Sequence, residues 1–319
     1  MTRKDIGVAL LLIVLCAVVA LASPQFLSVT NLQNVSRLVG TYGIFSIGVG
    51  IVIITGGIDL SVGSICALLG VLLSMMLVEW RWPAGVALAA AVTVGACLGG
   101  IHGLLVARLR LQPFIVTLCG LLLYRGAARY IARDSTKGLG TGEGFEWVRT
   151  VASGSIGGVP MPFILLGVVA VAAWLLLHRS VFGRHLIAIG RNEEAARYAG
   201  VRTQAVIAWA YVISGTLTGV SAIIIAFYTN SISPASHGNF YELYAIAAAV
   251  VGGCSLRGGE GSIAGIVMGA ALLQVLRNLV NLLDIPGSLD FAVMGGVILL
   301  GAIADQIVAR RSRARRAGP

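Results

Sequence analysis

Charged residues are scarce in this sequence. Of its 319 residues only 11% are Asp, Glu, Lys or Arg, while 57% are apolar. Soluble domains carry roughly a quarter charged residues, so a soluble fold would leave most of these apolar side chains without a core to enter. The shortage of charge therefore excludes a soluble globular protein and predicts an integral membrane protein.

Catalytic and metal-binding patterns are also missing. No G-x-x-x-x-G-K-[ST] motif is present, so the chain has no P-loop with which to bind ATP by itself. The histidines have no Cys, Asp or Glu at metal-ligand spacing, and the cysteines form no C-x-x-C pair. We expect the histidines to be interfacial or packing residues: His102, His178, His185 and His237. We expect the cysteines to be small buried apolar side chains: Cys16, Cys66, Cys97, Cys119 and Cys254. The chain is predicted to be no enzyme and to bind no metal or cofactor.

The apolar residues fall into about ten continuous runs. They lie at 6–22, 38–55, 61–78, 84–106, 114–132, 162–178, 206–227, 243–256, 263–283 and 291–309. A helix needs about 20 residues to cross the hydrocarbon, whereas a membrane β-barrel shows short alternating segments. The run at 243–256 is short for a crossing, so eight or nine crossings with re-entrant pieces are the alternative. The sequence predicts an all-α membrane protein of about ten transmembrane helices, in one domain over 1–319.

The basic residues indicate how the chain enters the membrane. The net charge is +10, but Lys and Arg cluster at the ends of the apolar runs, which favours a topological role over nucleic-acid binding. With the N-terminus in the cytoplasm, 15 of the 23 basic residues lie on that side. Both termini are then cytoplasmic, with 133–160 outside, 179–204 inside and 310–319 as a basic cytoplasmic tail. The 133–160 loop is either a flexible connection or a docking surface or lid.

The segment Gly56–Ser64 interrupts what would otherwise be about forty apolar residues. It contains Asp59, the only acidic residue between Asp5 and Glu79. Acids within the membrane are costly and are often functional. Asp59 is alternatively the N-cap of the following helix. Both interpretations can hold together, because transporters often contain a broken helix whose ends face a polar route. The topology places it in the cytoplasmic half, so we expect a hinge or an inner gate.

A short capped helix is predicted within the 179–204 loop. Asn192 is a suitable N-cap, Glu193 and Glu194 suit the first turn, and Gly200 is a suitable C-cap. A charged helix on the cytoplasmic face either docks a soluble partner or only adds positive charge on that side. The defined caps favour docking.

Three arginines lie within predicted spans. Arg125 and Arg129 are four residues apart near the outer end of their span and could snorkel. Arg277 is followed by Asn278 and Asn281, and these three side chains cannot all face lipid. They either hold helices together or line a polar cavity.

The chain resembles the membrane-spanning permeases of bacterial ABC importers of the ribose, arabinose, xylose and galactose class. Five stretches between residues 24 and 305 carry the likeness, in order and with few gaps. They are Pro24–Leu32 (PQFLSVTNL), Gly56–Ser64 (GGIDLSVGS), Gln112–Leu118 (QPFIVTL) leading to Arg125-Gly126, Gly183–Gly200 with its NEEAA, and Tyr241–Gly253. The combination is specific, although each piece alone is weak.

The resemblance implies a permease of the type II-like architecture in the bacterial inner membrane. It implies a second copy or a related permease, a periplasmic or lipid-anchored sugar-binding protein, and a separate ATPase with two nucleotide-binding modules that uses ATP and Mg²⁺. The coupling loop for that ATPase would comprise Gly190, Arg191, Asn192, Glu193, Glu194, Ala195, Ala196, Arg197 and Gly200. The substrate route or gate would comprise Gly56, Gly57, Asp59, Ser61, Ser64, Thr117, Arg277 and Asn278.

The sequence departs from that family at three places. Many relatives carry Asp where this chain has Tyr244, Thr where it has Cys254, and an Asn pair where it has Arg277-Asn278. The cargo is therefore either a monosaccharide, or a sugar-like signalling furanose such as autoinducer-2, or another small polar solute. An ion-coupled secondary transporter is the rival mechanism, but it needs an acid–base relay in the membrane.

Overall fold

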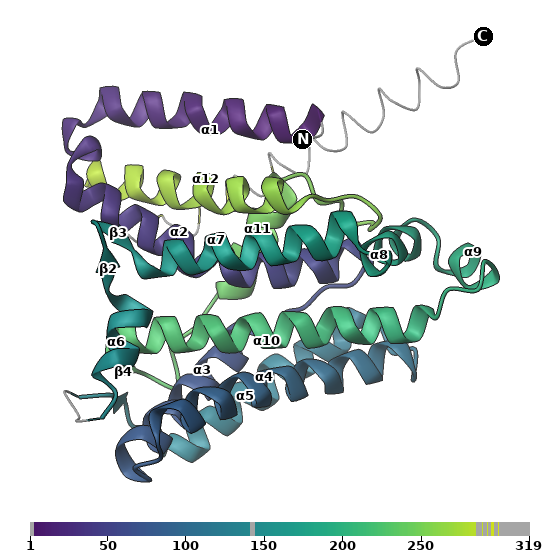
Figure 1. Cartoon of the computed structure of the whole chain (residues 1–319), viewed down its shortest axis with the longest axis horizontal. Coiled ribbons are helices and arrows are strands. Elements are labelled where there is room, and N and C mark those ends of the chain that lie inside the picture. Colours follow the sequence, from purple (N-terminus) through teal and green to yellow (C-terminus); the bar gives the residue numbers. More distant parts are fainter. Residues whose placement is uncertain are drawn as a thin grey trace.

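The computed structural model describes residues 3–140 and 144–284, and the isolated positions 289, 292, 295, 296 and 299. In these residues the chain forms a helical bundle with four two-residue strands (Figure 1). Helix α1 lies along one flank and α3, α4 and α5 along the other, with α12, α2, α7, α11 and α10 between them. The predicted all-α membrane fold is confirmed.

Eight helices of the described residues are long and apolar enough to cross a membrane. They are α1 (Arg3–Ala22), α2 (Val29–Ile54), α3 (Val62–Ser74) with the π-helical turn Met75–Glu79, α4 (Ala84–Ala107), α5 (Pro113–Ala132), α7 (Met161–Trp174) with the π-helical turn Leu175–Arg179, α10 (Thr203–Thr229) and α12 (Ile263–Leu282). The predicted short run is α11 (Tyr241–Val251). Apart from positions 292, 295, 296 and 299, the run predicted at 291–309 lies outside the described residues.

Helix α2 starts earlier than hydropathy predicts. Its first residue is Val29, not residue 38, because Ser28 caps the helix by accepting the Asn31 backbone N–H. The added turns are helical but polar, so hydropathy alone does not detect them. From Val39 to Ile54 every residue of α2 is buried, which makes this stretch the centre of the core.

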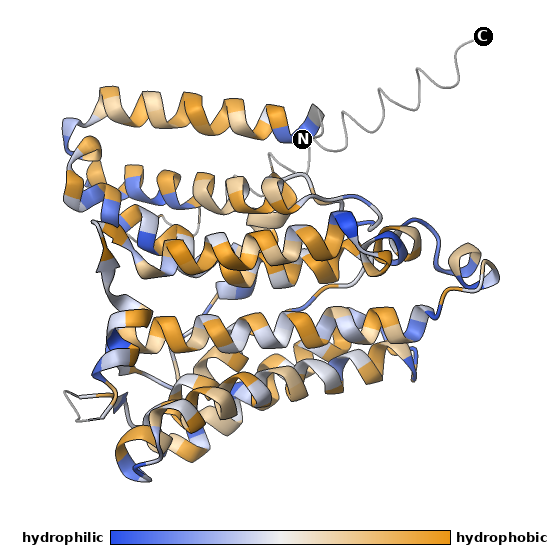
Figure 2. Cartoon of the chain, viewed as in Figure 1, coloured by the Kyte–Doolittle hydropathy of each residue, from blue (hydrophilic) through white to orange (hydrophobic). Residues whose placement is uncertain are grey.

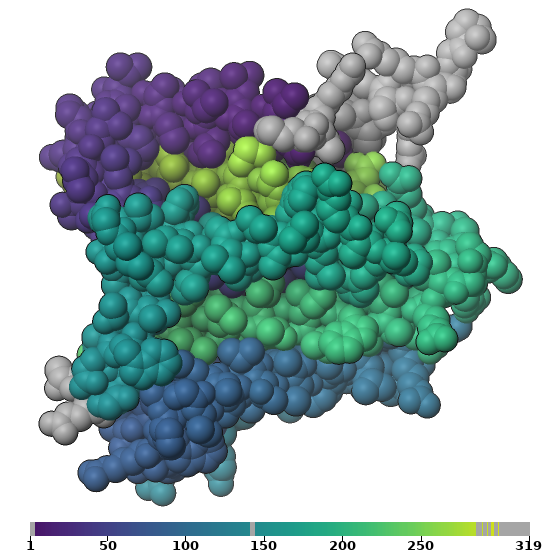
Figure 3. Space-filling model, viewed as in Figure 1, coloured from purple at the N-terminus to yellow at the C-terminus, as the bar shows by residue number. Residues whose placement is uncertain are grey.

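The molecule has two polar ends. Figure 2 shows hydrophobic residues along the helices and hydrophilic ones gathered at their ends. One end, the α6 edge, holds α6 (Glu146–Ser153), the antiparallel pair of β1 (Lys137–Gly138) with β4 (Ser231–Ile232), and the hairpin of β2 (Ser155–Ile156) and β3 (Val159–Pro160). The opposite end, the α9 edge, holds α8 (Val181–Arg191) and α9 (Glu193–Tyr198). In Figure 3 the green segment with α9 projects at the right of the molecule.

The described part of 133–160 is folded onto the bundle. Leu139, Phe145 and Val148 are buried in a small core with Phe227 of α10 and Ile232 of β4. Arg149 donates to the Gly140 carbonyl at 2.6 Å. The described residues of this loop are therefore packed and not a flexible connection, while its role as a docking surface or lid stays a prediction.

Polar contacts hold the first turn of α1 at the α9 edge. The Lys4 ammonium lies 2.7 Å from Glu260 Oε2, and Ser262 Oγ donates to the buried Asp5 carboxylate. The Lys4 hydrogen bond lowers the pKa of Glu260 below its usual value. Helix α1 therefore begins at the same edge as α9 and is fixed to the segment between α11 and α12.

Candidate functional site

The candidate site is built around the break between α2 and α3, residues Thr55–Ser61. Helix α2 ends at Ile54, and Gly56 then takes a φ of 85°, a backbone conformation that glycine adopts without a Cβ penalty. Helix α3 begins at Val62, and Ser61 is its N-cap residue. Asp59 is therefore not the N-cap. Its carboxylate faces the break itself.

Asp59 is buried, with 1% of its surface exposed, and its carboxylate accepts three hydrogen bonds. Its Oδ1 accepts from the Ser61 backbone N–H at 3.1 Å and from Ser61 Oγ at 2.6 Å. Its Oδ2 accepts from Ser214 Oγ of α10 at 2.9 Å. A buried charge is tolerated only when it is bonded in this way, so the fold is organised to retain a carboxylate at this position.

The same network continues through a buried histidine. Ser61 Oγ lies 3.3 Å from His102 Nδ1 of α4, and the Tyr124 hydroxyl of α5 lies 2.9 Å from His102 Nε2. We call Asp59, Ser61, His102, Tyr124 and Ser214 the Asp59 network. It joins the break to three helices that are far away in the sequence. His102 is buried, as expected of a packing residue, and both of its ring nitrogens also lie within hydrogen-bond distance of side chains.

The Ile58 carbonyl is held from two sides. It accepts a hydrogen bond from the Tyr211 hydroxyl of α10 at 3.3 Å. It also lies 3.2 Å from Thr117 Oγ1 of α5, whose one hydroxyl hydrogen it shares with the nearer Pro113 carbonyl at 2.9 Å. Thr117 was predicted as a route or gate residue, and the structure places it against the break. Ser64, also predicted as a route or gate residue, is buried on α3. Its hydroxyl has no hydrogen-bond partner among the described residues.

A cleft of about 340 Å³ connects the break with α9. Gly56 and Gly57 form part of its wall, and Glu193, Glu194 and Arg197 of α9 form another part. The turn between α4 and α5 contributes the remaining polar wall. Helix α9 and the two glycines of the break therefore line one cleft.

The predicted capped helix is present as α9. Asn192 Oδ1 accepts the Ala195 backbone N–H at 2.9 Å, and Glu193 and Glu194 occupy the first turn. Gly200 follows the helix with a φ of 84°. One boundary differs from the expectation, because residues 190 and 191 close the preceding helix α8.

Gly190 brings the end of α8 into contact with the end of α2. The Gly259 backbone N–H donates to the Ile54 carbonyl at 2.8 Å, and a Cβ on Gly190 would lie 2.0 Å from that same carbonyl oxygen. The C-terminus of α8, the C-terminus of α2 and the segment before α12 thus meet backbone to backbone. The closest contacts at this junction are between backbone atoms.

A second broken segment lies between β4 and α11. Helix α11 has 11 residues, which span about 16 Å at 1.5 Å per residue, roughly half of a 30 Å hydrocarbon core. Residues 233–240 lead from the α6 edge to its start. There Gly238 meets Gly63 of α3 so closely that a Cβ on Gly63 would lie 2.2 Å from the Gly238 carbonyl oxygen. Two helix N-termini, those of α3 and α11, therefore meet inside the bundle.

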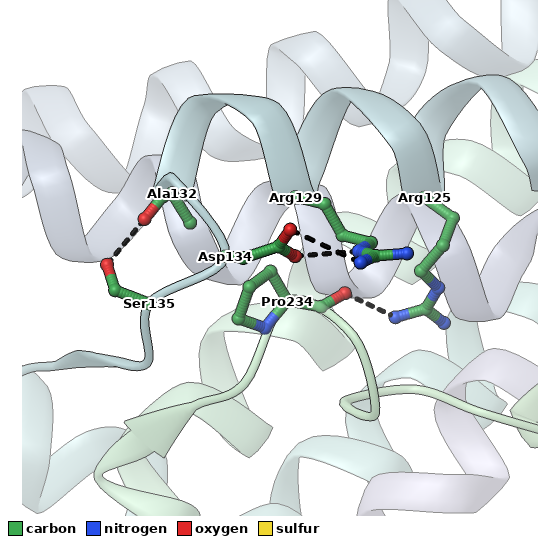
Figure 4. Close-up of polar contacts among 6 residues, drawn as sticks. All are labelled: Arg125, Arg129, Ala132, Asp134, Ser135 and Pro234. Atoms are coloured by element: carbon green, nitrogen blue, oxygen red, sulfur yellow. Dashed lines mark hydrogen bonds and ion pairs between the residues drawn. The ribbon is translucent and has the colours of Figure 1, made fainter.

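Arg125 of α5 holds this second segment in place. Its Nη1 donates to the carbonyls of Pro234 at 3.0 Å and His237 at 2.6 Å, and Figure 4 shows the first of these bonds. The expectation that Arg125 snorkels is wrong, since its charge is used on backbone carbonyls within the protein. Arg129 behaves differently and pairs with Asp134 at the exposed end of α5.

A polar hollow of about 400 Å³ lies between α2 and α12. Arg277 and Asn278 both line it, so the structure brings these two predicted residues together. Asn278 exchanges two hydrogen bonds with Asn31, at 3.0 and 2.7 Å, and the Arg277 guanidinium lies 5.3 Å from the centre of the Tyr244 ring. Gln274 also lines the hollow, and its buried Oε1 has no hydrogen-bond partner among the described residues.

The cysteines and histidines form no metal site in the described part of the chain. All five cysteines are free thiols. Cys66 and Cys254 are buried, but Cys97 of α4 and Cys119 of α5 are exposed on the bundle, so the expectation of burial is wrong for these two. Burial raises the pKa of the Cys254 thiol to about 12, which keeps it protonated at neutral pH. This agrees with the expectation that Cys254 is a small buried side chain.

Comparison with known proteins identifies the family. Residues 31–302 match the family described as "Branched-chain amino acid transport system / permease component". The chain belongs to this permease family. No solved structure matches the permease.

Three curated relatives of the permease come from Escherichia coli K12. The ribose import permease protein RbsC is 39% identical over 294 residues, covering 92% of this chain and 91% of the relative. The D-allose transport system permease protein AlsC is 31% identical over 305 residues, covering 95% and 92%. The xylose transport system permease protein XylH is 31% identical over 344 residues, covering 90% and 87%. The permease is thus similar to these transporters over nearly its whole length.

Proposed function

We propose that this permease is the membrane-spanning subunit of an ATP-driven importer for a monosaccharide. The likeness to ribose, allose and xylose permeases over about nine-tenths of the chain carries the proposal. The chain has no P-loop, so ATP and Mg²⁺ would be bound by a partner ATPase. An extracytoplasmic binding protein would deliver the sugar.

The α9 edge is the proposed ATPase interface. Helix α9 projects at this edge, and Tyr198 is 85% exposed there. Its first-turn acids line the cleft that ends at Gly56 and Gly57. A partner that bound α9 differently in two nucleotide states would shift the break through this cleft, since a ligand moves an equilibrium only by its differential affinity.

This interface fixes the proposed orientation. Arginines are concentrated at the α9 edge, as the positive-inside rule requires of a cytoplasmic face. They include Arg108, Arg110, Arg184, Arg191, Arg197 and Arg202. Helix α1 begins at this same edge. The N-terminus is therefore assigned to the cytoplasm and the α6 edge to the outside, where the binding protein would dock.

A second permease copy, or a related permease, is proposed to complete the route. Asn239 and Phe240 are exposed in the non-helical segment before α11. Non-helical backbone at membrane depth is not stable against lipid and must face protein or water. The polar hollow between α2 and α12 offers amide groups of the kind that bind sugar hydroxyls, and we assign it to the substrate route.

Gln274 provides a test of this assignment. Gln274→Leu should lower sugar uptake about tenfold, the usual effect of one lost hydrogen bond of about 1.4 kcal/mol. The unfolding temperature should not fall, because the Oε1 atom has no hydrogen-bond partner among the described residues to lose. Gln204→Leu, at an exposed position of α10, is the matched control. Unchanged uptake by the Gln274 variant would remove the hollow from the route.

The cargo is tested with the assembled complex. The permease is purified with its ATPase and binding protein in lipid nanodiscs, and ATP hydrolysis is measured with D-ribose, D-allose, D-xylose or autoinducer-2. We expect one of the three monosaccharides to stimulate hydrolysis. Stimulation by autoinducer-2 alone would support the furanose alternative and refute the monosaccharide assignment.

A further inference from the structure

His102 is inserted between α4 and α5 where a glycine leaves room for it. A Cβ on Gly120 of α5 would lie 2.5 Å from His102 Nε2, so any larger residue there would displace the imidazole. Tyr124 lies four residues later, on the same face of α5, and reaches the same ring nitrogen. The imidazole is 1% exposed. Both ring nitrogens are thus committed to protein groups.

Counting hydrogens gives the direction of each bond in the Asp59 network. Ser61 has one hydroxyl hydrogen, and it donates this to Asp59 Oδ1 at 2.6 Å. Ser61 Oγ can therefore serve His102 only as an acceptor, so His102 Nδ1 must carry a hydrogen. Nε2 of a neutral imidazole is then the acceptor for the Tyr124 hydroxyl. Each hydrogen bond is therefore donated in the same direction, from Tyr124 to His102, from His102 to Ser61 and from Ser61 to Asp59.

This directed chain connects helix α5 to the break. Leu122 and Leu123 on the outer face of α5 are 66% and 68% exposed, so the helix is packed on one side only. The side that packs carries Thr117, whose Oγ1 lies 3.2 Å from the Ile58 carbonyl oxygen, and Tyr124, which starts the chain. Helix α5 therefore contacts the break at two levels, and Tyr124 provides the hydrogen-bonded one.

We propose that His102 and Tyr124 are positioning residues that make α5 and the α2–α3 break move as one unit during transport. The inference rests on the proposed function, since it concerns the step between ATPase-driven movement at α9 and opening of the route. Neither side chain contacts the substrate in this account. They act by fixing the orientation of the Asp59 carboxylate and the position of α5 against the break.

Transport measurements on single and double variants test whether His102 and Tyr124 act through the same link. Tyr124→Phe should lower sugar uptake per ATP hydrolysed by about fivefold to tenfold, the effect of one buried hydrogen bond. His102→Asn, which can still reach Ser61 but not Tyr124, should do the same. The double variant should be no worse than either single variant, because both remove the same link. Tyr130→Phe, whose ring is 86% exposed on α5, should leave the ratio unchanged. Additive effects of the two single variants would refute the link.

A spectroscopic measurement tests the chain independently of transport. The ¹⁵N spectrum of histidine-labelled full-length permease in lipid should show His102, identified by its loss in His102→Asn, with hydrogen on Nδ1 and none on Nε2. Tyr124→Phe should shift the Nε2 signal and leave the other three histidines unchanged. Hydrogen on Nε2, or no response to Tyr124→Phe, would overturn the proposal. This result stands even if the transported solute is not a monosaccharide.

Discussion

Asp59→Ala should lose about a hundredfold of its transport rate, far more than it loses in membrane expression. The substitution leaves two buried hydroxyls and one backbone N–H without their acceptor, and each buried group left unpaired costs about 1–3 kcal/mol. The break would settle in a different conformation, so α9 would no longer be linked to the route. Uptake of radiolabelled sugar, normalised to permease in the membrane, measures the loss.

Two variants separate the role of Asp59 from a general effect of losing an acid. Asp134→Ala removes an exposed carboxylate that pairs with Arg129, and its uptake should match that of the wild type. Asp59→Asn keeps one acceptor oxygen for Ser61, and its uptake should fall between those of Asp59→Ala and the wild type. If Asp59→Ala transports normally, the carboxylate has no part in the movement of the break.

Replacing both Glu193 and Glu194 by Arg should abolish co-purification of the ATPase. These acids occupy the first turn of α9, where negative charge favours the helix N-terminus. They also face a cleft that already holds Arg110 and Arg197. Reversing both charges places four cations around this cleft, and mismatched charges at an interface cost several kcal/mol. We expect at least about a tenfold loss of bound ATPase in a pull-down from detergent.

The control is an acid in the same helical position at the opposite edge. Glu146 lies in the first turn of α6, and Glu146→Arg should retain the ATPase in full. Membrane insertion of all variants is checked by extraction and gel filtration. Wild-type levels of bound ATPase in the Glu193/Glu194 variant would move the docking site away from α9.

The features that the sequence could predict are those expressed in local chemistry. Hydropathy located the spans, and the interruption at Gly56–Ser64 was visible because polar residues are rare in this chain. The α9 helix was predictable because a side-chain cap, first-turn acids and a terminal glycine act over one or two turns. Helix α2 was predicted too short because its first turns are polar, and hydropathy does not report on helicity.

The partners of Asp59 could not be predicted, because they are distant in the chain. Ser61 is 41 residues from His102, and Asp59 is 155 residues from Ser214. His102 and Ser214 alone are each typical of packing in a membrane helix. Only the folded bundle shows that they share one hydrogen-bonded network. The short run at 243–256 already indicated a re-entrant piece, and α11 confirms that this helix is too short for a crossing. The contact between Gly63 and Gly238 could not be predicted, because these residues are distant in the chain.

One measurement tests the central claim most directly. The permease, its ATPase and its binding protein are reconstituted in liposomes, and entry of radiolabelled D-ribose, D-allose and D-xylose is followed under two driving forces. We predict that entry of one of these sugars requires ATP and the ATPase, and that a proton gradient alone drives none. Sugar entry on the proton gradient without the ATPase would contradict the account and identify a secondary transporter.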